Sequence, residues 1–504
     1  MIDLPHSQDH VTARRAIGAL NQIEQMPVSD RYRPDTLFEK LGPEFADPVA
    51  AARFPQHILR RRNQAWAARV GLDALSDAEW TAHFARFEPL PQNMSRPLAM
   101  RYHGHQFRNY NPDIGDGRGF LFAQLRDDRA RLLDFGTKGS GQTPYSRRGD
   151  GRLTLKGGVR EVLAAEMLEA LGVNTSKAFS LFETGEQLMR GDEPSPTRSS
   201  VLVRLQHSHV RFGTFQRLAY FERPDLIHQL IEHVCAAYYP QHLDLSGAQR
   251  AAAMFGEIVE ASGRLAGGWM GAGFVHGVLN TDNLNVTGES FDYGPWRFLP
   301  TSDPHFTAAY FDEGGLYAFG RQPEAVSWAL AQLGGVLTPV CPATLLEAEL
   351  ARFAPAYQEG LRATVFRRLA IKEGALSADI EFLADMFAWL TDTQAGWDQY
   401  FHDWVCGGAS ADRAQHSPQA ALYTEPAFTK IREGLDARTG NQERLNAPYY
   451  QQTIPVTMVI DEVERVWAAI AERDDWAPFE AKLNDIAELK AALSFCHGAV
   501  AEPD

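Results

Sequence analysis

The sequence predicts an α+β protein with two lobes: a sheet-rich N-lobe with one main helix, and a mostly helical C-lobe, preceded by a helical N-terminal extension. Residues 100–215 are rich in glycine, and short apolar runs such as GFLFAQL and RLLDFGT alternate there with turns, which is typical of a twisted antiparallel sheet. After LVRLQHSHVRFGTFQ, helical patterns such as LIHQLIEHVCAAYY fill most of the remaining chain.

Each segment has its own pattern. Residues 1–95, the extension, look helical and polar until PLPQNMSRP interrupts them. Residues 96–215 form the N-lobe, whose main helix we expect from Gly157 to Leu171, because apolar residues recur there at helical spacing and Gly172 follows as a C-cap. Residues 216–504 form the C-lobe, which opens on NLNV and SFDYG, two runs that flank a TGES turn like a short hairpin.

Composition limits the classes of function. The 504 residues are 44% apolar and 22% charged, which is ordinary for a soluble globular protein. The net charge of −15 argues against nucleic acid and anionic membranes as partners. The charge-free stretch from Ala325 to Leu346 contains glycines and prolines, so it predicts a buried helix followed by a loop and not a membrane span. The N-terminus lacks a secretory pattern, and we expect a cytoplasmic protein.

The four cysteines are scattered and show no C-x-x-C spacing, which suits a reducing compartment and gives no zinc signature. Cys235, Cys341 and Cys406 are expected to be buried apolar side chains. Cys496, near the C-terminus, is expected to be more accessible and is the one candidate for a redox role.

The segment HGVLNTDNLNVTGESFDYGP, residues 276–295, is similar to the catalytic segment of protein kinases, H-R-D-x-x-x-x-N followed by D-F-G. The asparagine position holds Asn283, and Asp292 begins D-Y-G, so this pair predicts a site for a divalent cation; turn formation is the alternative role. The position of the catalytic aspartate holds Val278, which cannot accept a proton. The chain has therefore either lost catalysis or performs different chemistry with the same metals.

Two further patterns suit nucleotide binding. DIGDGRGF carries Gly115, Gly117 and Arg118, whose backbone N–H groups and guanidinium could contact phosphate; an ordinary hairpin is the alternative. Lys138 ends a predicted strand and Glu161 lies on the following helix, a spacing that suits the kinase lysine–glutamate ion pair; otherwise Glu161 belongs to a solvated helix face.

Arginines in two other places extend this pattern. GSGQTPYSRRGDGR, residues 139–152, is either an ordered functional loop around Asp150 or a mobile basic loop. Arg204 and Arg211 bracket the end of the last predicted strand of the N-lobe. A buried guanidinium there needs an anion, either a carboxylate of this protein or a triphosphate.

Several long motifs identify a family. RYHGHQF, IGDGRG, DFGTKGSGQTPYSRRGDGR, GGVREVLAAEML, HSHVRFGTFQ, GFVHGVLNTDN, FDYGP and YAFGRQP occur in order over roughly residues 100–330. On these motifs the chain resembles the selenoprotein O family of protein adenylyltransferases, which have a kinase-like fold. The resemblance implies that residues 96–215 are the nucleotide-binding N-lobe and that residues 216–504 carry the catalytic and metal loops.

The resemblance also implies a reaction: a reversed ATP transfers AMP to Ser, Thr or Tyr hydroxyls of protein substrates, with Mg²⁺ or Mn²⁺ as cofactor. Asp282 would be the general base, Asn283 and Asp292 the metal ligands, and Glu161 the ion-pair partner of Lys138. The implied ATP contacts are Gly115, Gly117, Arg118, Lys138, Asp150, Gly151, Arg204, Arg211 and Asp292.

The resemblance is weaker near the C-terminus, where NAPYYQQTIPVTMVI replaces the N-P-x-x-x-x-R-N type segment of many relatives. Some relatives carry a selenocysteine or cysteine linked with redox control in a place comparable to that of Cys496. Three other functions stay open: an inactive ATP-binding scaffold, an ordinary kinase, and transfer of UMP from UTP with Mn²⁺.

Overall fold

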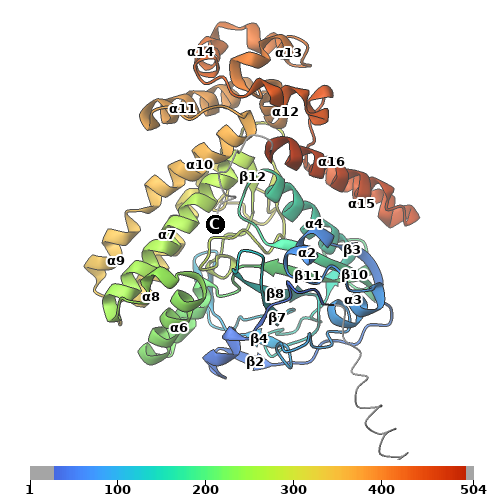
Figure 1. Ribbon diagram of the computed structural model, residues 1–504, viewed down its shortest axis with the longest axis vertical. Coiled ribbons are helices and arrows are strands. Elements are labelled where there is room, and N and C mark those ends of the chain that lie inside the picture. The colour runs from blue at the N-terminus through green and yellow to red at the C-terminus, as the bar shows by residue number, and fades with distance from the viewer. Residues whose placement is uncertain (1–27, 495–504) are drawn as a thin grey trace, which may run out of the picture.

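The computed structural model describes residues 28–494 and shows an α+β fold, as predicted (Figure 1). Its main element is a curled sheet of nine strands in which all the pairs are antiparallel, with the order β2-β4-β7-β8-β11-β10-β3, β1 beside β7 and β9 beside β11. These strands are β1 (Pro34–Asp35), β2 (Ala46–Pro48), β3 (Ile58–Arg62), β4 (Leu98–Met100), β7 (Leu121–Arg126), β8 (Leu132–Lys138), β9 (Leu153–Thr154), β10 (Lys177–Leu188) and β11 (Thr197–Gln206). Two small sheets pair β5 (Gly104–Gln106) with β6 (Asn109–Asn111) and β12 (Phe274–Val275) with β13 (Arg297–Phe298).

The prediction of a helical N-terminal extension is wrong for residues 28–95. Strands β1, β2 and β3 lie in this part and join the main sheet, beside the short helices α2 (Gln64–Arg69) and α3 (Asp77–Phe84). The run of arginines in β3 looks polar in sequence, but partners distant in the chain neutralise it: Arg60 pairs with Glu183 at 2.6 Å and Arg61 with Glu166 at 2.7 Å. Tertiary ion pairs therefore override the local pattern.

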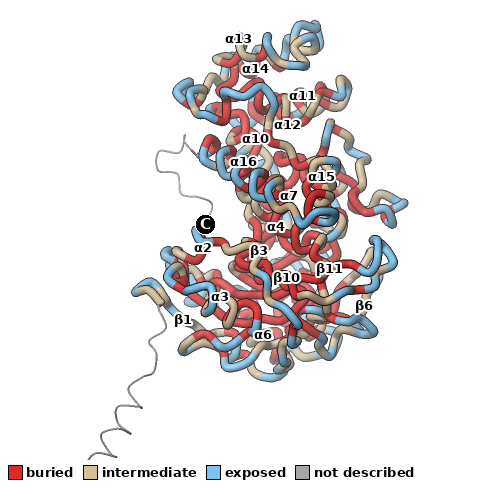
Figure 2. Tube along the Cα trace, turned by 90° about the vertical axis from the view of Figure 1, so that its right-hand side faces the viewer, coloured by how far each residue is buried: buried red, intermediate tan, exposed pale blue. Residues whose placement is uncertain are grey.

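The main helix of the sheet region is α4 (Leu155–Ala170), close to the predicted span. It begins two residues earlier because the Thr154 hydroxyl accepts a hydrogen bond from Gly157 N at 3.1 Å and caps the first turn. Its buried face packs on β10 and β11, and α16 covers it from the other side (Figure 1). Figure 2 shows that the red, buried trace runs through these strands and α4.

Helices make up most of the chain after β11. They are α5 (Phe212–Tyr220), α6 (Pro224–Tyr238), α7 (Gly247–Ala272), α8 (Gln322–Leu337), α9 (Ala343–Leu350), α10 (Phe353–Leu369), α11 (Leu376–Thr393), α12 (Trp397–Asp403), α13 (Ala411–Ala414), α14 (Thr429–Ala437), α15 (Ile460–Arg473) and α16 (Ala477–Ser494). In Figure 1, α6 to α10 flank the sheet on one side, and α11 to α14 form a separate layer at the end farthest from it. Helices α7 and α10 approach closely, since a Cβ on Gly267 would lie 2.3 Å from the Tyr357 carbonyl oxygen.

The predicted hairpin around TGES does not form. Asn285 instead bridges to Arg211, and Ser290 bridges to Thr175, so the two runs pair with the sheet region and not with each other. These bridges connect the loop that carries Asn283 and Asp292 to the end of β11 and the segment after α4. The loop is therefore held by both parts of the fold.

The charge-free stretch, residues 325–346, forms α8 from its fourth residue onward, the turn after it and the start of α9. The inner face of α8 is buried. Among residues 28–494, none of the helices is long and apolar enough to cross a membrane. Cys235, Cys341 and Cys406 are buried, as expected, and Cys496 lies outside the described residues.

Candidate active site

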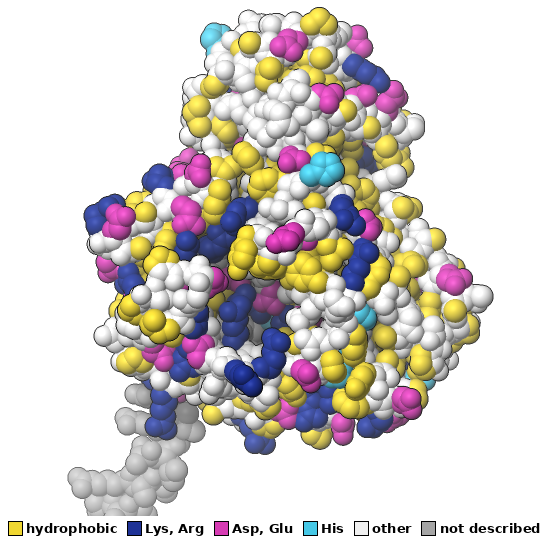
Figure 3. Space-filling view, turned by 180° about the vertical axis from the view of Figure 1, so that it is seen from behind, with side chains coloured by type: hydrophobic (Ala, Val, Ile, Leu, Met, Phe, Trp, Pro, Cys, Tyr) yellow, Lys and Arg dark blue, Asp and Glu magenta, His cyan; other side chains and the backbone are white. Residues whose placement is uncertain are grey.

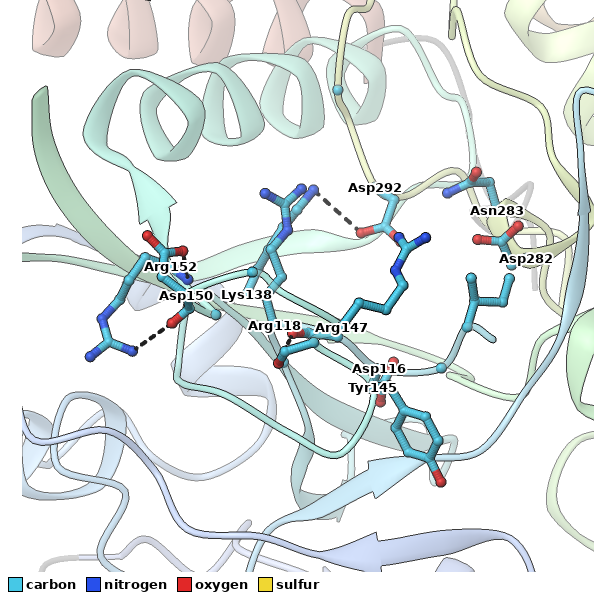
Figure 4. A pocket seen from close by; sticks show the side chains of 18 of the residues that line it. Asp116, Arg118, Lys138, Tyr145, Arg147, Asp150, Arg152, Asp282, Asn283 and Asp292 are labelled. Carbon is cyan, nitrogen blue, oxygen red and sulfur yellow. Dashed lines mark hydrogen bonds and ion pairs between the residues drawn. The ribbon is translucent and has the colours of Figure 1, made fainter. Parts of the chain in front are cut away.

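A cleft of about 750 Å³ lies between the main sheet and the loops around β12 and β13. It brings together residues that are widely separated in sequence (Figure 4). Every predicted ATP-contact, base and metal residue lines it: Gly115, Gly117, Arg118, Lys138, Asp150, Gly151, Arg204, Arg211, Asp282, Asn283 and Asp292. Asp282, Asn283 and Asp292 lie together on one side, and Asp150 lies on the opposite side.

The cleft is cationic although the whole chain carries a charge of −15. Eight Lys and Arg side chains line it against four Asp side chains, and Figure 3 shows dark-blue side chains gathered around a hollow on that face. Among residues 28–494, the side chains of Arg118, Arg147 and Arg148 find no hydrogen-bond or ion-pair partner, and all three residues are exposed. Such an excess of free cations attracts a polyanion.

Lys138 is the last residue of β8, and its side chain reaches two carboxylates, those of Glu161 and Asp292. Its Nζ contacts the carboxylate of Glu161 on α4 and lies 3.4 Å from Asp292 Oδ1. Because Lys138 and Glu161 are both buried, this ion pair fixes the ammonium group at the cleft wall.

Asp292 receives most of the cationic contacts. The Arg204 guanidinium contacts its Oδ1, and Arg211 Nη1 donates a hydrogen bond to its Oδ2 at 2.8 Å. Burial alone would raise the pKa of Asp292, but Arg204, Lys138 and Arg211 together hold it well below its usual value. The carboxylate is therefore ionised, and it is the anion that the buried Arg204 requires.

Asp282 has a different environment. It lies on the 3₁₀ turn Thr281–Asn283, is 8% exposed, and its Oδ1 has no hydrogen-bond partner in the described part of the chain. Burial raises its pKa to about 6. A carboxylate with this pKa, at the cleft and with a free oxygen, is suited to accept a proton near neutral pH. Val278 lines the same cleft without a proton acceptor.

Hydrogen bonds to β5 and α5 position the Asp282 turn. The Thr281 hydroxyl accepts from His105 N and donates to Gln216 Oε1, each at 2.7 Å. A Cβ on Gly104 would lie 2.8 Å from Asp282 Oδ1, so the glycine lets β5 pass directly behind the carboxylate.

The glycine loop has a packing role as well. A Cβ on Gly115 would lie 2.5 Å from Tyr145 Cγ, and one on Gly117 would lie 3.0 Å from the Tyr145 carbonyl oxygen. The loop around Gly117 therefore rests on residues 143–146. Across the cleft, Arg190 Nη1 holds the Asp150 carboxylate at 2.8 Å, and Gly151 adopts a positive φ of 70°.

Sequence reasoning missed Asp116, which lies inside the glycine loop and lines the cleft. Its Oδ2 accepts a hydrogen bond from Met100 N at 3.0 Å, and its Oδ1 lies 3.5 Å from Arg211 Nη2. Burial raises its pKa. An acidic residue between two glycines was the available signal, but only the fold places it against Arg211.

The donor set fits a hard divalent cation that also binds phosphate. Asn283 and Asp292 offer an amide and a carboxylate oxygen at the same side of the cleft. Within residues 28–494 no group of three or more His, Cys, Asp and Glu side chains could hold a metal ion. A metal bound here would therefore take its remaining ligands from phosphate and water.

The family model described as "Protein adenylyltransferase SelO" matches residues 29–487 of the chain. The chain belongs to the SelO family of protein adenylyltransferases. It is an enzyme family, and its members include relatives named "Protein nucleotidyltransferase YdiU". The relative from Synechococcus elongatus is 45% identical over 478 residues, which cover 90% of this chain and 94% of the relative.

Two other relatives carry the same name. The one from Gloeobacter violaceus is 46% identical over 471 residues, with 89% of this chain and 93% of the relative covered. The one from Myxococcus xanthus is 33% identical over 417 residues, which cover 82% of each chain. The similarity therefore includes both the sheet region and most of the helical region.

Proposed function

We propose that this SelO-family protein has a kinase-like, two-lobed fold and transfers AMP from ATP to Ser, Thr or Tyr hydroxyls of protein substrates in a metal-dependent reaction. The observation that carries the proposal is the free, buried Oδ1 of Asp282 beside Asn283 and Asp292, in a cleft where Val278 occupies the position of the kinase base. The nucleotide would lie between residues 96–215 and the catalytic and metal loops of residues 216–504.

Reversed binding of ATP would direct the α-phosphate toward Asp282. The free guanidinium groups of Arg118 and Arg147, with Lys138, would bind the phosphates and reduce the charge repulsion that opposes attack. Asn283 and Asp292 would hold Mg²⁺ or Mn²⁺, which would add further neutralisation of phosphate charge when bound.

Asp282 would perform the proton transfer. Its carboxylate would accept the proton of the acceptor hydroxyl while that oxygen bonds to the α-phosphorus. The bond between the α-phosphorus and the bridging oxygen would break, and pyrophosphate would leave with the electron pair. Because burial raises the pKa of Asp282 to about 6, it would be a stronger base than an exposed aspartate and still mostly ionised at neutral pH.

Labelled ATP tests the reaction class. The protein is incubated with Mg²⁺ and a protein acceptor such as casein, once with ATP labelled at the α-phosphate and once at the γ-phosphate. AMP transfer predicts covalent label from the α-phosphate alone. Transfer of γ-label would identify a kinase, and ATP binding without either label would identify a scaffold. A parallel reaction with α-labelled UTP and Mn²⁺ tests UMP transfer.

A further inference from the structure

Four aromatic side chains stand out among the exposed large hydrophobic residues between residues 28 and 494. They form two Tyr-Phe pairs: Tyr220 and Phe221, 55% and 52% exposed, and Tyr310 and Phe311, 84% and 49% exposed. Exposed aromatic pairs are costly to solvate and are enriched at protein-binding surfaces. The two pairs differ in their position relative to the cleft.

The Tyr310-Phe311 pair follows residues that pack against the edge of the cleft. The two residues before it pack on the start of the catalytic segment, since a Cβ on Gly277 would lie 3.0 Å from Ala308 Cβ and 2.9 Å from Pro295 Cγ. Pro295 and Val278 both line the cleft. The exposed pair follows directly after Ala309, whose N would lie 3.6 Å from the same Cβ on Gly277, so it begins next to residues that pack against the cleft edge.

The same pair rests on a rigid support. The Phe311 ring packs on Phe107 at 5.8 Å between centroids, and Phe107 packs on the buried Tyr317 at 5.0 Å. Asn280 Oδ1 accepts hydrogen bonds from Phe107 N at 3.0 Å and from the Tyr317 hydroxyl at 2.9 Å. Asn280 begins the turn that carries Asp282, so the residues that support Phe311 also position the turn of the candidate base.

The turn between β5 and β6 adds an independent indication. Its two central residues, Phe107 and Arg108, both have positive φ, at 49° and 63°, a conformation that usually requires Asn or Gly. Such strain in bulky residues persists where the surrounding structure fixes it, often at functional sites. Here the strained backbone places the Phe107 ring under Phe311 and its N–H on Asn280.

We propose that Tyr310 and Phe311 form the docking surface for the acceptor protein and select an apolar side chain close to the hydroxyl that is modified. The inference rests on the proposed function, because an acceptor must approach Asp282. A protein acceptor has to pass the cleft edge for its hydroxyl to reach the carboxylate, and this edge offers two exposed rings on a rigid support. An apolar side chain of the acceptor would cover them and remove both partners from water.

The Tyr220-Phe221 pair offers a matched control. It has the same two residue types, both exposed and with the phenylalanines at similar exposure, but it lies at the far end of α5, about 14 Å along the helix from Arg211 at the cleft. Its rings pack on Tyr110 and His103, and not on Phe107 or Tyr317, which support Phe311.

The experiment measures transfer of α-label from ATP to a set of synthetic peptides with one central Ser, Thr or Tyr, in which each flanking position is varied. Wild type is expected to favour an apolar residue at one flanking position at least fivefold. The Tyr310→Ser/Phe311→Ser variant should lose this preference, while its nucleotide affinity and its rate on peptides without the apolar residue stay within twofold of wild type. The Tyr220→Ser/Phe221→Ser variant should keep the preference.

Failure has distinct forms. If wild type modifies peptides and the 310–311 variant keeps the same preference, the docking surface is refuted and the proposed function stands. If wild type transfers label neither to casein nor to any of the peptides, the proposed function itself fails. If sedimentation shows a wild-type dimer that only the 310–311 variant breaks, the rings belong to an interface between copies of the chain, and the inference is wrong.

Discussion

Arg211 Nη1 donates a hydrogen bond to the carbonyl oxygen of Asp282 at 2.6 Å. The same nitrogen donates to Asp292 Oδ2 at 2.8 Å, so one buried guanidinium fixes the spacing between the candidate base and the candidate metal ligand. Nη2 of the same side chain faces Asp116 Oδ1 at 3.5 Å, and the single ammonium nitrogen of a lysine cannot occupy the positions of both Nη1 and Nη2. Arg211 therefore links three of the four acidic residues that line the cleft.

Arg211→Lys is expected to lower the single-turnover rate of AMP transfer by about 10²-fold, because one ammonium nitrogen keeps the charge but cannot reach Asp282, Asp292 and Asp116 from the two positions that Nη1 and Nη2 occupy. The rate is measured with α-labelled ATP at saturation. Arg217→Lys, on the helix that begins directly after Arg211 and outside the cleft lining, is the control and should keep the wild-type rate. A wild-type rate for Arg211→Lys would show that this linkage has no role in catalysis.

Glu161→Gln tests the ion pair at the cleft wall. Without the Glu161 charge, the Lys138 ammonium is expected to move toward Asp292, 3.4 Å away, and to be less available to phosphate. We expect ATP affinity, measured by calorimetry, to fall roughly tenfold, equivalent to about 1.4 kcal/mol. Glu166→Gln on the same helix is a matched control, because Glu166 pairs with Arg61 and does not contact Lys138. Equal losses for both variants would contradict this role.

Two glycine substitutions, one where α7 packs on α10 and one on an open face of α8, are expected to have opposite effects on stability. Gly267→Ala would place a Cβ 2.3 Å from the Tyr357 carbonyl oxygen and should lower the free energy of unfolding by about 1–3 kcal/mol. Gly335→Ala on α8 meets no atom within 4 Å and should raise it by up to about 1 kcal/mol through helix propensity. Urea denaturation measures both. Equal effects of the two substitutions would contradict the close packing of α7 on α10.

The ion pairs of Glu169 are expected to contribute to stability in a pH-dependent way. Burial would raise its pKa, but Lys177 at 3.3 Å and Lys490 at 3.1 Å lower it to about 2. The ion pairs therefore stabilise the folded state above the unfolded pKa of about 4.5, and this contribution is lost as pH falls from there toward 2.

Glu169→Gln should accordingly reduce the free energy of unfolding by roughly 2–3 kcal/mol at pH 7, and the difference from wild type should shrink steadily between pH 4.5 and pH 3. Glu488→Gln, at an exposed position on α16, is the control and should change stability little at either pH. A difference for Glu169→Gln that does not depend on pH would mean that the carboxylate acts through packing alone.

Much of the cleft could be predicted from sequence because its parts lie in long local motifs. The apolar spacing predicts α4, and the positions of Lys138 at the end of a strand and Glu161 on the next helix predict their contact. The N-terminal strands could not be predicted, because the arginines of β3 are compensated by Glu183 and Glu166, each more than a hundred residues away. Asp116 was missed for the same reason: its partner Arg211 lies on another element.

The loop after Asn283 shows a different limit. Its sequence has the turn residues of a hairpin, and local chemistry alone favours one. In the fold, the backbone of Val286 donates to Val210 and that of Ser290 donates to Asn174, so distant segments compete successfully for the same hydrogen-bonding groups. Such competition can be seen only once the chain is folded.

Asp282 is proposed to accept the proton that Val278 cannot. The most direct measurement is the single-turnover rate of AMP transfer by Asp282→Asn, with ATP binding measured on the same sample. The role of Asp282 as base predicts a loss of about 10²–10⁴-fold in rate with ATP affinity within threefold of wild type. Transfer at the wild-type rate by Asp282→Asn would contradict it.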